Sequence, residues 1–431
     1  MLHSNLNVNK EGHLTFAGLD TVSLCEKYGT PLMLLDENKV RENLQTYVSV
    51  MKKAFGENSF PCFASKSLSF TDIYRIVKEE GAGIDIVSPG ELYTALRAGF
   101  PVEKAFFHGN NKTDDDIKYA ISSGVGYFVV DNAEELYEIE RQCAEKNHTQ
   151  KILVRLSPGV DPHTHAKITT GQVDSKFGIA IETGQAIDFV GKVLECSHIE
   201  LCGYHCHVGS QSFDSQCFMD AAEIMLRFIK DVLDRYGLET KILNLGGGYG
   251  VRYVDSDPEI DIPFNLNLLA ENIKALCTEL RILMPQIIME PGRSIVANAG
   301  LTLYTCGSVK TITGYKSYVS IDGGMADNPR YALYNSAYTV LNASKADKKA
   351  DMVATIAGRC CESGDLIQEG VSIKTPERGD RIAVLVTGAY NYSMASNYNR
   401  LPRPPIVSIY NGKDRVVVKR ETFEDLVKNE I

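Results

Sequence analysis

The feature that most constrains the fold is a regular alternation of short β-branched or aromatic runs with longer amphipathic segments. Short apolar runs of this kind are typical of buried strands, and the segments between them are typical of helices. Strands that are separated by helices pair in parallel, because a parallel pair needs a crossover connection. Eight candidate strands are found, at 60–65, 83–87, 104–108, 126–130, 151–156, 198–206, 241–245 and 286–290.

Eight strand–helix units are the number at which a parallel sheet closes on itself. We therefore predict a (β/α)8 TIM barrel over residues 37–296. A doubly wound open sheet is the alternative that the periodicity leaves open. The main helices are expected at 37–54, 72–80, 90–98, 113–122, 132–147, 214–236 and 265–284, with Asp36, Asp72, Thr113, Asp131 and Asp214 as N-caps.

From about residue 297 the pattern changes to strand-like runs separated by Gly, Pro and Asn, which is typical of an all-β domain. Residues 1–36 contain two more strands, at 12–17 and 31–35, that are too short to form a sheet alone. We predict a discontinuous β-sandwich or β-barrel domain, formed by residues 1–36 and 297–431, with the TIM barrel inserted into it. Its later strands are expected at 301–312, 317–322, 352–357, 381–386 and 405–410.

The charge of the chain argues against two classes of partner. Its 45 basic and 55 acidic residues give a net charge of −10, and the two signs are interspersed. Nucleic acids and anionic membrane surfaces are therefore not expected as partners.

The first ten residues lack the basic and apolar regions of a secretory signal. With eleven scattered cysteines that lack metal-ligand spacing, we expect a cytoplasmic protein with reduced thiols and no metal.

Polar and glycine-rich residues follow directly after most of the predicted barrel strands. The C-terminal ends of barrel strands form the rim at which the active sites of this fold are built. The sequence therefore predicts an active site at this rim. The residues concerned are Lys66, Ser88, Gly109 to Asn111, His207 to Gln211, Gly246 to Gly248, and Gly292 with Arg293.

Two charged residues end apolar strands of the barrel. Lys66 closes the strand at 60–65, so we expect its amine in the barrel mouth, where loss of hydration makes it nucleophilic. A lysine that reaches back to solvent is the alternative. Glu290 needs a cationic or N–H partner to stay charged at the end of its strand. An ion pair with Arg293 is the structural alternative for Glu290.

The glycines and a histidine supply further parts of a binding site. Gly246 to Gly248 allow backbone N–H groups to approach an anion, and loops after strands seven and eight commonly bind phosphate in this fold. A flexible turn is the alternative, but Arg293 and Ser210 favour a phosphate site. His207 follows His205 at a spacing of two, and a metal would need further ligands that the sequence does not indicate. A ring-stacking or core histidine is therefore favoured for His207.

An amine, a phosphate site, a flat imidazole and a carboxylate at one barrel mouth are the groups that pyridoxal 5'-phosphate requires. Eight segments also resemble, in order and spacing, the alanine-racemase-like, fold-type III decarboxylases that use this cofactor. The resemblance covers about residues 20–410 and is strongest to members that act on meso-2,6-diaminopimelate, because of CESGD and of DGGMADNPRYALY at 322–334. The eight segments are FASKS at 63–67, GIDIVSPGEL at 83–92, HGNNK at 108–112, HCHVGSQ at 205–211, GGGYG at 246–250, EPGR at 290–293, CESGD at 361–365 and GAYNYSMASNYN at 388–399.

The resemblance implies a role for each matching residue around the cofactor. Lys66 would be the Schiff-base lysine, with Asp85 as its polar neighbour. His207 would stack on the cofactor ring, and Glu290 would pair with the pyridine nitrogen. The residues implied around the phosphate are Ser210, Gly248, Gly292, Arg293, which also faces the substrate, and Tyr390 from a second subunit.

The resemblance also implies how the substrate is bound and converted to L-lysine. Arg330 and Tyr334 match positions that hold the distal carboxylate, and Tyr390 is expected to contact the substrate as well. Cys361 and Glu362 would come from the second subunit of a homodimer, with Cys361 as the proton donor to the α-carbon. Cys360 leaves open which thiol faces the site, and we choose Cys361 because it directly precedes Glu362.

Three other functions are considered beside this one. A barrel racemase would use a tyrosine as its second base and would need no distal carboxylate site. An inactive regulatory homologue typically lacks the lysine or the glutamate, whereas Lys66, Glu290 and Cys361 are all present. A related decarboxylase of the ornithine or arginine type would need only an anion at the far end of the pocket.

Overall fold

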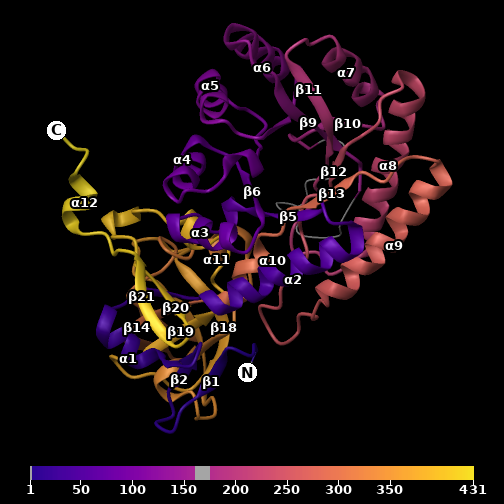
Figure 1. The fold of residues 1–431 in the computed structure, drawn as a ribbon. Helices are drawn as coiled ribbons and strands as arrows, with labels where there is room; N and C mark the ends of the chain where they lie inside the picture. Colours follow the sequence, from indigo (N-terminus) through magenta and orange to yellow (C-terminus); the bar gives the residue numbers. More distant parts are fainter. Residues whose placement is uncertain (1, 161–174) are drawn as a thin grey trace. The chain divides into compact units, whose positions relative to one another are not determined.

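The computed structural model describes residues 2–160 and 175–431, and the chain divides into two compact units (Figure 1). One unit contains residues 43–250 and 260–292. The other contains residues 1–42, 251–259 and 293–431.

The first unit is a closed barrel of eight parallel strands, as predicted. Each strand pairs in parallel with the next, and β13 pairs with β5 through Ile288 opposite Phe60, which closes the sheet. The eight expected runs all form strands, and the closing pair of β13 with β5 rules out the doubly wound alternative, which is an open sheet. The strands are β5 (Phe60–Ala64), β6 (Gly83–Ile86), β7 (Ala105–Phe107), β8 (Tyr127–Val130), β9 (Gln150–Ser157), β11 (Ile199–His205), β12 (Ile242–Asn244) and β13 (Gln286–Met289).

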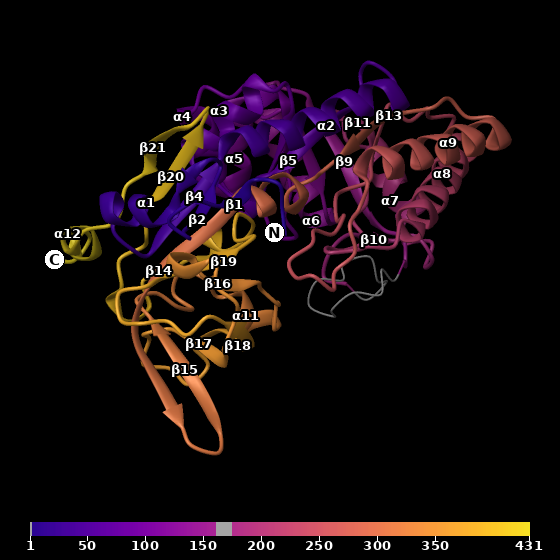
Figure 2. The ribbon, with the colours of Figure 1, turned by 90° about the horizontal axis from the view of Figure 1, so that it is seen from below.

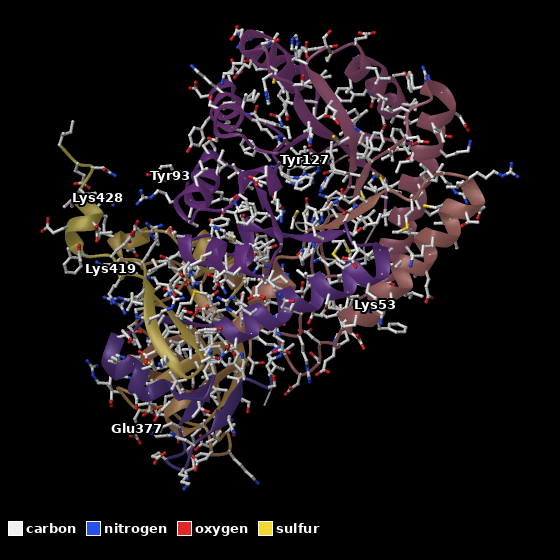
Figure 3. The ribbon with its side chains drawn as sticks, viewed as in Figure 1. Lys53, Tyr93, Tyr127, Glu377, Lys419 and Lys428 are labelled. Atoms are coloured by element: carbon white, nitrogen blue, oxygen red, sulfur yellow. The ribbon has the colours of Figure 1, made fainter. Side chains whose placement is uncertain are left out.

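The barrel interior is filled by side chains from seven of these strands. They form one buried cluster, of which no member is more than 4% exposed: Cys62, Phe106, Val129, Leu153, Cys202, Ile242 and Ile288. Tyr127, labelled in Figure 3, stacks on Phe106 with ring centroids 4.6 Å apart. Gly203 is required where β11 meets β12, because a Cβ there would lie 1.8 Å from the carbonyl oxygen of Ile242. The barrel is thus a packed core, and chemistry is confined to its rim.

Helices connect the strands where amphipathic segments were predicted. They are α2 (Glu37–Phe55), α3 (Thr71–Glu79), α4 (Pro89–Arg97), α5 (Asp114–Ser123), α6 (Ala133–Lys146), α8 (Gln216–Tyr236) and α9 (Ile262–Leu280). Thr113 caps α5 as expected, and the Lys39 backbone N–H donates to Asp36 at the start of α2. The other three predicted N-caps are wrong by one or two residues: Phe70, Asn132 and Ser215 take the positions expected for Asp72, Asp131 and Asp214.

Helix α7 and strand β10 of the barrel unit were not predicted. Helix α7 (Gln185–Leu194) begins after Gly184, which offers no capping side chain, and contains Gly191, so the usual start and composition signals are missing. The short strand β10 (Ile179–Ala180) pairs with β9 outside the closed barrel. Within the described residues, no helix is long and apolar enough to cross a membrane.

The second unit is built on a mixed sheet that joins both ends of the chain. Strand β4 (Leu32–Asp36) pairs antiparallel with β14 (Gly300–Ile312) and parallel with β20 (Ile406–Tyr410). This confirms a discontinuous β domain. The other strands of the sheet are β15 (Lys316–Ile321), β16 (Val340–Asn342), β17 (Met352–Ala357), β18 (Leu366–Ile373), β19 (Arg381–Leu385) and β21 (Lys413–Val418).

Smaller elements complete this unit. Strands β1 (Leu6–Val8), β2 (Leu14–Phe16) and β3 (Leu19–Asp20) form a separate three-stranded sheet. Figure 2 shows β14 and β15 as a long hairpin, and Ile312 and Lys316 are its last paired residues. The short helices are α1 (Thr21–Tyr28), α10 (Arg293–Val296), α11 (Arg330–Tyr334) and α12 (Phe423–Val427).

Candidate active site

Lys66 lies directly after β5, in a single 3-10 turn formed by Ser65–Ser67. Its Nζ is 3.7 Å from Oδ2 of Asp85 on β6, whose side chain is 1% exposed. Burial raises the pKa of Asp85, and the charges of His108 and Lys66 oppose that rise. The Lys66 side chain is 42% exposed, so its amine keeps more contact with solvent than we expected from the sequence. An accessible amine beside a buried carboxylate is suited to form a covalent bond with a carbonyl compound.

Glu290 follows β13 and is held by three side chains from other strand ends. The amide of Asn244 donates to Oε1 at 2.7 Å, and His205 contacts Oε2 at 3.1 Å through Nε2. Nε2 of His108 lies 2.8 Å from Oε1. Burial alone would raise the pKa of Glu290, but the two imidazoles bring it well below its usual range. Glu290 is therefore a buried carboxylate that stays ionised and has a fixed orientation.

His205 supports Glu290 as a neutral donor. Burial is the main cause that lowers the pKa of His205, to about 3, although Glu290 opposes the shift. At neutral pH the ring is therefore uncharged, and its contact with Glu290 assigns the proton to Nε2. The ligand atoms of His108, His205 and Glu290 lie within 4.8 Å of one another, which is close enough to hold a metal ion. We assign them to the support of Glu290, because each imidazole already contacts that carboxylate.

The glycine-rich loop after β12 is packed closely rather than free to move. A Cβ on Gly247 would lie 2.0 Å from the Glu290 carbonyl oxygen. Gly248, with φ of +131°, would place a Cβ 2.4 Å from the carbonyl oxygen of Gly209. Only glycine fits these two positions, which argues against the flexible-turn alternative. The loop keeps its backbone open for close approach, as an anion site requires.

His207 is oriented by this loop. The backbone N–H of Gly247 donates to Nδ1 of His207 at 3.3 Å, so the ring carries its proton on Nε2. Burial, followed by the positive charges of Lys66 and Arg155, lowers the pKa of His207 well below its usual range. The ring is therefore neutral and fixed, which suits stacking on a flat ligand. His207 is not part of the cluster of His108, His205 and Glu290.

Gly292 and Ser210 are two further candidates for the phosphate site. Gly292 packs tightly, because a Cβ there would lie 2.9 Å from that of Ala64 and 3.0 Å from that of Ser67. Ser210 is half-buried at the end of the segment after β11. Both belong to the barrel unit, as do Lys66, Asp85, His207, Gly248 and Glu290.

Arg293 belongs to the second unit and lies among tyrosines. Its Nη1 donates to the hydroxyl of Tyr253 at 2.7 Å, and its guanidinium lies 4.9 Å from the ring of Tyr390. Burial acts to lower the pKa of Arg293, but the phenol groups of Tyr253 and Tyr390 raise it overall. Tyr338 packs edge-on against Tyr253, with ring centroids 5.6 Å apart. The result is a buried cation in an aromatic setting.

Arg330 begins α11 and forms a second cation of this kind. Its guanidinium lies 4.8 Å from the ring of Tyr334 and 5.2 Å from that of Tyr390, so Tyr390 contacts both arginines. Arg330 is only 5% exposed, and its Nε makes no hydrogen bond to any described residue. A buried charge normally has a polar partner. This geometry therefore suits the binding of an anionic group from a ligand.

The doubled cysteine divides into one buried and one exposed thiol. Cys360 is buried, and burial raises its pKa to about 11. Cys361 is exposed, and its backbone N–H donates to Asn399 at 2.7 Å. Glu362 beside it is exposed as well. Of the two thiols, Cys361 is the one that a ligand can reach.

Sequence reasoning missed several side chains that shape these sites. His108 is the last residue of the predicted strand at 104–108, and Asn244 lies one residue before the end of the predicted strand at 241–245, so the rim rule that found Lys66 could also have identified them. Arg155 is a charged residue inside an apolar strand, 3.9 Å from Asp131. Tyr253 and Tyr338 carry no local signal, because residues far apart in sequence bring them together.

Comparison with known proteins agrees with this chemistry. Residues 40–297 match the family model described as "Pyridoxal-dependent decarboxylase, pyridoxal binding domain". The chain is similar to diaminopimelate decarboxylase of Bacillus subtilis (44% identity, 99% of this chain and 97% of the relative). It is also similar to that of Staphylococcus aureus (42%, 98% of each). A crystal structure of the M. jannaschii enzyme in complex with L-lysine superposes with a TM-score of 0.91 at 33% identity, covering 100% of this chain and 99% of the other.

The fold and the barrel site therefore define a pyridoxal-dependent decarboxylase. Within that class, the chain belongs to the family of the diaminopimelate decarboxylases.

The neutral state of His205 predicts a specific loss of stability in acid. Between pH 6.5 and about 3, the unfolded chain binds a proton at this residue that the folded protein does not, so stability falls as the pH falls. His205→Gln keeps an N–H donor but removes this proton. The free energy of unfolding is measured in urea at pH 7 and at pH 5 for both proteins. From pH 7 to pH 5 the wild type should lose about 2 kcal/mol more of this free energy than the variant.

The control for this comparison is His148→Gln, because His148 is exposed. This variant should show the same pH dependence as the wild type. An equal loss in wild type and His205→Gln would mean that His205 is charged in the folded protein.

Proposed function

We propose that this protein decarboxylates meso-2,6-diaminopimelate at its D-centre, with pyridoxal 5'-phosphate as cofactor, to give L-lysine and carbon dioxide. The observation that carries the proposal is Arg330, a buried guanidinium whose Nε has no hydrogen-bond partner among the described residues. Diaminopimelate ends in a distal carboxylate that would pair with it. The names of the similar proteins support the same substrate.

The residues that we assign to the proposed cofactor offer the groups that it requires. Lys66 offers the amine for covalent attachment, and Asp85 lies beside that amine. His207 offers a neutral ring for stacking, and Glu290 offers an ionised carboxylate for the pyridine nitrogen. Ser210, Gly248, Gly292, Arg293 and Tyr390 are assigned to the phosphate. When bound, pyridoxal phosphate supplies an electron sink for the bond to the departing carboxylate.

The chain's own groups then control two protons. The carboxylate of Glu290, fixed by Asn244 and His205, would keep a proton on the nitrogen of the cofactor ring. Because His205 is neutral, it orients Glu290 without cancelling its charge. Cys361 would return a proton to the α-carbon once carbon dioxide has left. Its exposed thiol is available for this role, whereas that of Cys360 is buried.

Substrate choice is assigned to opposite charges at the far end of the pocket. Arg330 and Tyr334 would hold the distal carboxylate, and Glu362 would hold the distal ammonium. Arg293 and Tyr390 are the other residues that we assign to the substrate. A decarboxylase of the ornithine or arginine type has no distal carboxylate to bind, so a buried Arg330 favours diaminopimelate.

A homodimer is proposed as the active unit, with Cys361 and Glu362 acting in the site of the partner. Tyr390 is assigned differently from our expectation: it contacts Arg293 of its own chain at 4.9 Å. We therefore propose that Tyr390 and Arg293 of one chain serve the same phosphate.

The cytoplasm is the proposed location, because all eleven cysteines are free thiols.

The proposed function is tested by assay of the purified protein loaded with pyridoxal phosphate. It should release carbon dioxide from meso-diaminopimelate, and borohydride should fix a pyridoxyl label on Lys66. Lys66→Ala should lose both properties, because no other residue is assigned to hold the cofactor covalently. Because meso-diaminopimelate has no optical rotation, the racemase alternative is tested with L-alanine, whose rotation a racemase would abolish without release of carbon dioxide. A label on a different lysine would overturn the assignment of Lys66.

Arg330→Ala tests the distal carboxylate site. The variant should lose about 10²-fold or more in kcat/KM for diaminopimelate, because it leaves the substrate carboxylate unpaired. Its cofactor absorbance should match that of the wild type. Arg400→Ala serves as a control, because Arg400 is an exposed arginine of the same unit that pairs with Glu430. Unchanged efficiency in Arg330→Ala, or wild-type turnover of ornithine, would show that the site is misassigned.

Hybrid dimers test the proposed sharing of sites. Lys66→Ala and Cys361→Ala proteins should each be nearly inactive. When equal amounts are mixed, dissociated and reassociated, about half of the dimers are hybrids with one intact site of two, so activity should return to about a quarter of the wild type. If no activity returns although subunit exchange is confirmed, Cys361 serves its own chain or has no catalytic role.

A further inference from the structure

Asp365, the last residue of the CESGD segment, has no role in the site described so far. Its side chain is buried, with an exposure of 3%. The backbone N–H of Met325 donates to Oδ1 at 2.5 Å, and that of Cys360 donates to Oδ2 at 2.6 Å. One carboxylate therefore binds two segments that lie more than thirty residues apart in the sequence. Hydrogen bonds to an ionised acceptor are among the stronger ones in proteins.

The two segments carry different parts of the proposed substrate site. Residues 322–329 lead into α11, which begins with Arg330. Residues 358–365 carry Cys361 and Glu362. A further backbone hydrogen bond joins the segments, from Arg359 N–H to the carbonyl oxygen of Gly323 at 3.0 Å. Asp365 lies at the junction between the proposed proton donor and the proposed carboxylate site.

Two glycines make room for this carboxylate. A Cβ on Gly324 would lie 2.4 Å from Oδ1 of Asp365, and one on Gly358 would lie 2.2 Å from Oδ2. Gly358 has no positive φ, so the need for glycine at that position comes from the carboxylate. The N–H of Gly358 also donates to the backbone oxygen of Asp365 at 2.9 Å. Each segment thus has a glycine at the position where it packs against Asp365.

A second carboxylate, that of the half-buried Asp327, holds the same turn. Asp327 accepts a hydrogen bond from Gly324 N–H at 3.0 Å and one from the hydroxyl of Tyr304 at 2.5 Å. Burial is the main cause that raises the pKa of Asp327 to about 7, and the negative charge of Asp365 adds to the rise. Successive backbone N–H groups, of Gly324 and Met325, therefore point to different carboxylates. The turn before Arg330 has a fixed shape.

We propose that Asp365 is a positioning residue that sets the Cys361–Glu362 segment against the segment leading to Arg330. The roles of Cys361 and Arg330 rest on the proposed function, whereas the junction itself does not. Loss of the Asp365 carboxylate should therefore disturb proton donation and distal carboxylate binding together. It should also change the reactivity of the Cys361 thiol, which can be measured without any substrate.

Two variants disturb the junction in different ways. Asp365→Asn places an amide NH2 against one of the two backbone N–H donors, so one hydrogen bond is lost. Gly358→Ala keeps every hydrogen-bonding group but pushes a methyl group onto Oδ2. The matched control is Asp380→Asn, because Asp380 is a half-buried aspartate of the same unit that bonds Asn342 and the backbone of Glu377, which lie outside both segments.

Each variant is prepared with its cofactor, and its thermal unfolding midpoint is compared with the wild type. The rate of Cys361 alkylation by iodoacetamide is followed by peptide mass spectrometry, and kcat and KM are measured for diaminopimelate. Asp365→Asn and Gly358→Ala should change the alkylation rate by about tenfold or more, lower kcat by about 10²-fold and raise KM, since a displacement of about 1 Å can cost that much. For Asp380→Asn, the alkylation rate, kcat and KM should each stay within about twofold of the wild-type value.

Wild-type alkylation, kcat and KM in Asp365→Asn or in Gly358→Ala would overturn the proposal. So would a change in either variant that Asp380→Asn matches, because the effect would then be a general loss of stability. If the wild type releases no carbon dioxide from diaminopimelate, the proposed function fails, but the alkylation rates still decide whether Asp365 positions Cys361.

Discussion

A single buried carboxylate, Glu290, sets the requirements for the rest of the barrel site. An ionised group with 6% exposure is costly unless hydrogen bonds replace its water. Asn244 and His205 supply such hydrogen bonds, and His108 lies 2.8 Å from the same carboxylate, each at the end of a different strand. A closed barrel can provide such contacts because all its strands end at one rim. The ionised state of Glu290 thus depends on the closed barrel, because the barrel brings its partners to the same rim.

Neutral partners matter as much as charged ones in this arrangement. If His205 were positively charged, it would cancel the charge of Glu290 and weaken its effect on a ring nitrogen. Burial keeps His205 neutral, with a pKa of about 3, while its N–H still orients the carboxylate. In the second unit the charge has the opposite sign. The aromatic rings around Arg330 carry no negative charge, so its guanidinium remains available for an incoming anion. Each unit therefore holds a charge ready for a group of opposite charge.

The parts of the fold that depend on local periodicity could be predicted from the sequence. All eight barrel strands and the helices flanked by clear signals were found, whereas α7, which follows Gly184, was missed. The site residues that follow apolar strands, such as Lys66 and Glu290, were likewise identified by position. Tyr253 and Tyr338 were missed, because their importance comes from neighbours that only the folded chain brings close. Asp365 was part of a recognised segment, but its contact with Met325 could not be read from that segment.

The central place of β4 has a consequence for the order in which the chain can fold. Residues 32–36 leave the ribosome early, but their two strand partners, β14 and β20, lie at 300–312 and 406–410. All five residues of β4 are buried, so this segment has no stable environment until almost the whole chain has been made. The barrel, whose strands pair mostly with their neighbours in sequence, can form first. During synthesis, β4 is therefore an unpaired apolar strand until β14 and β20 have been made, and such a strand is prone to pair with other chains in the meantime.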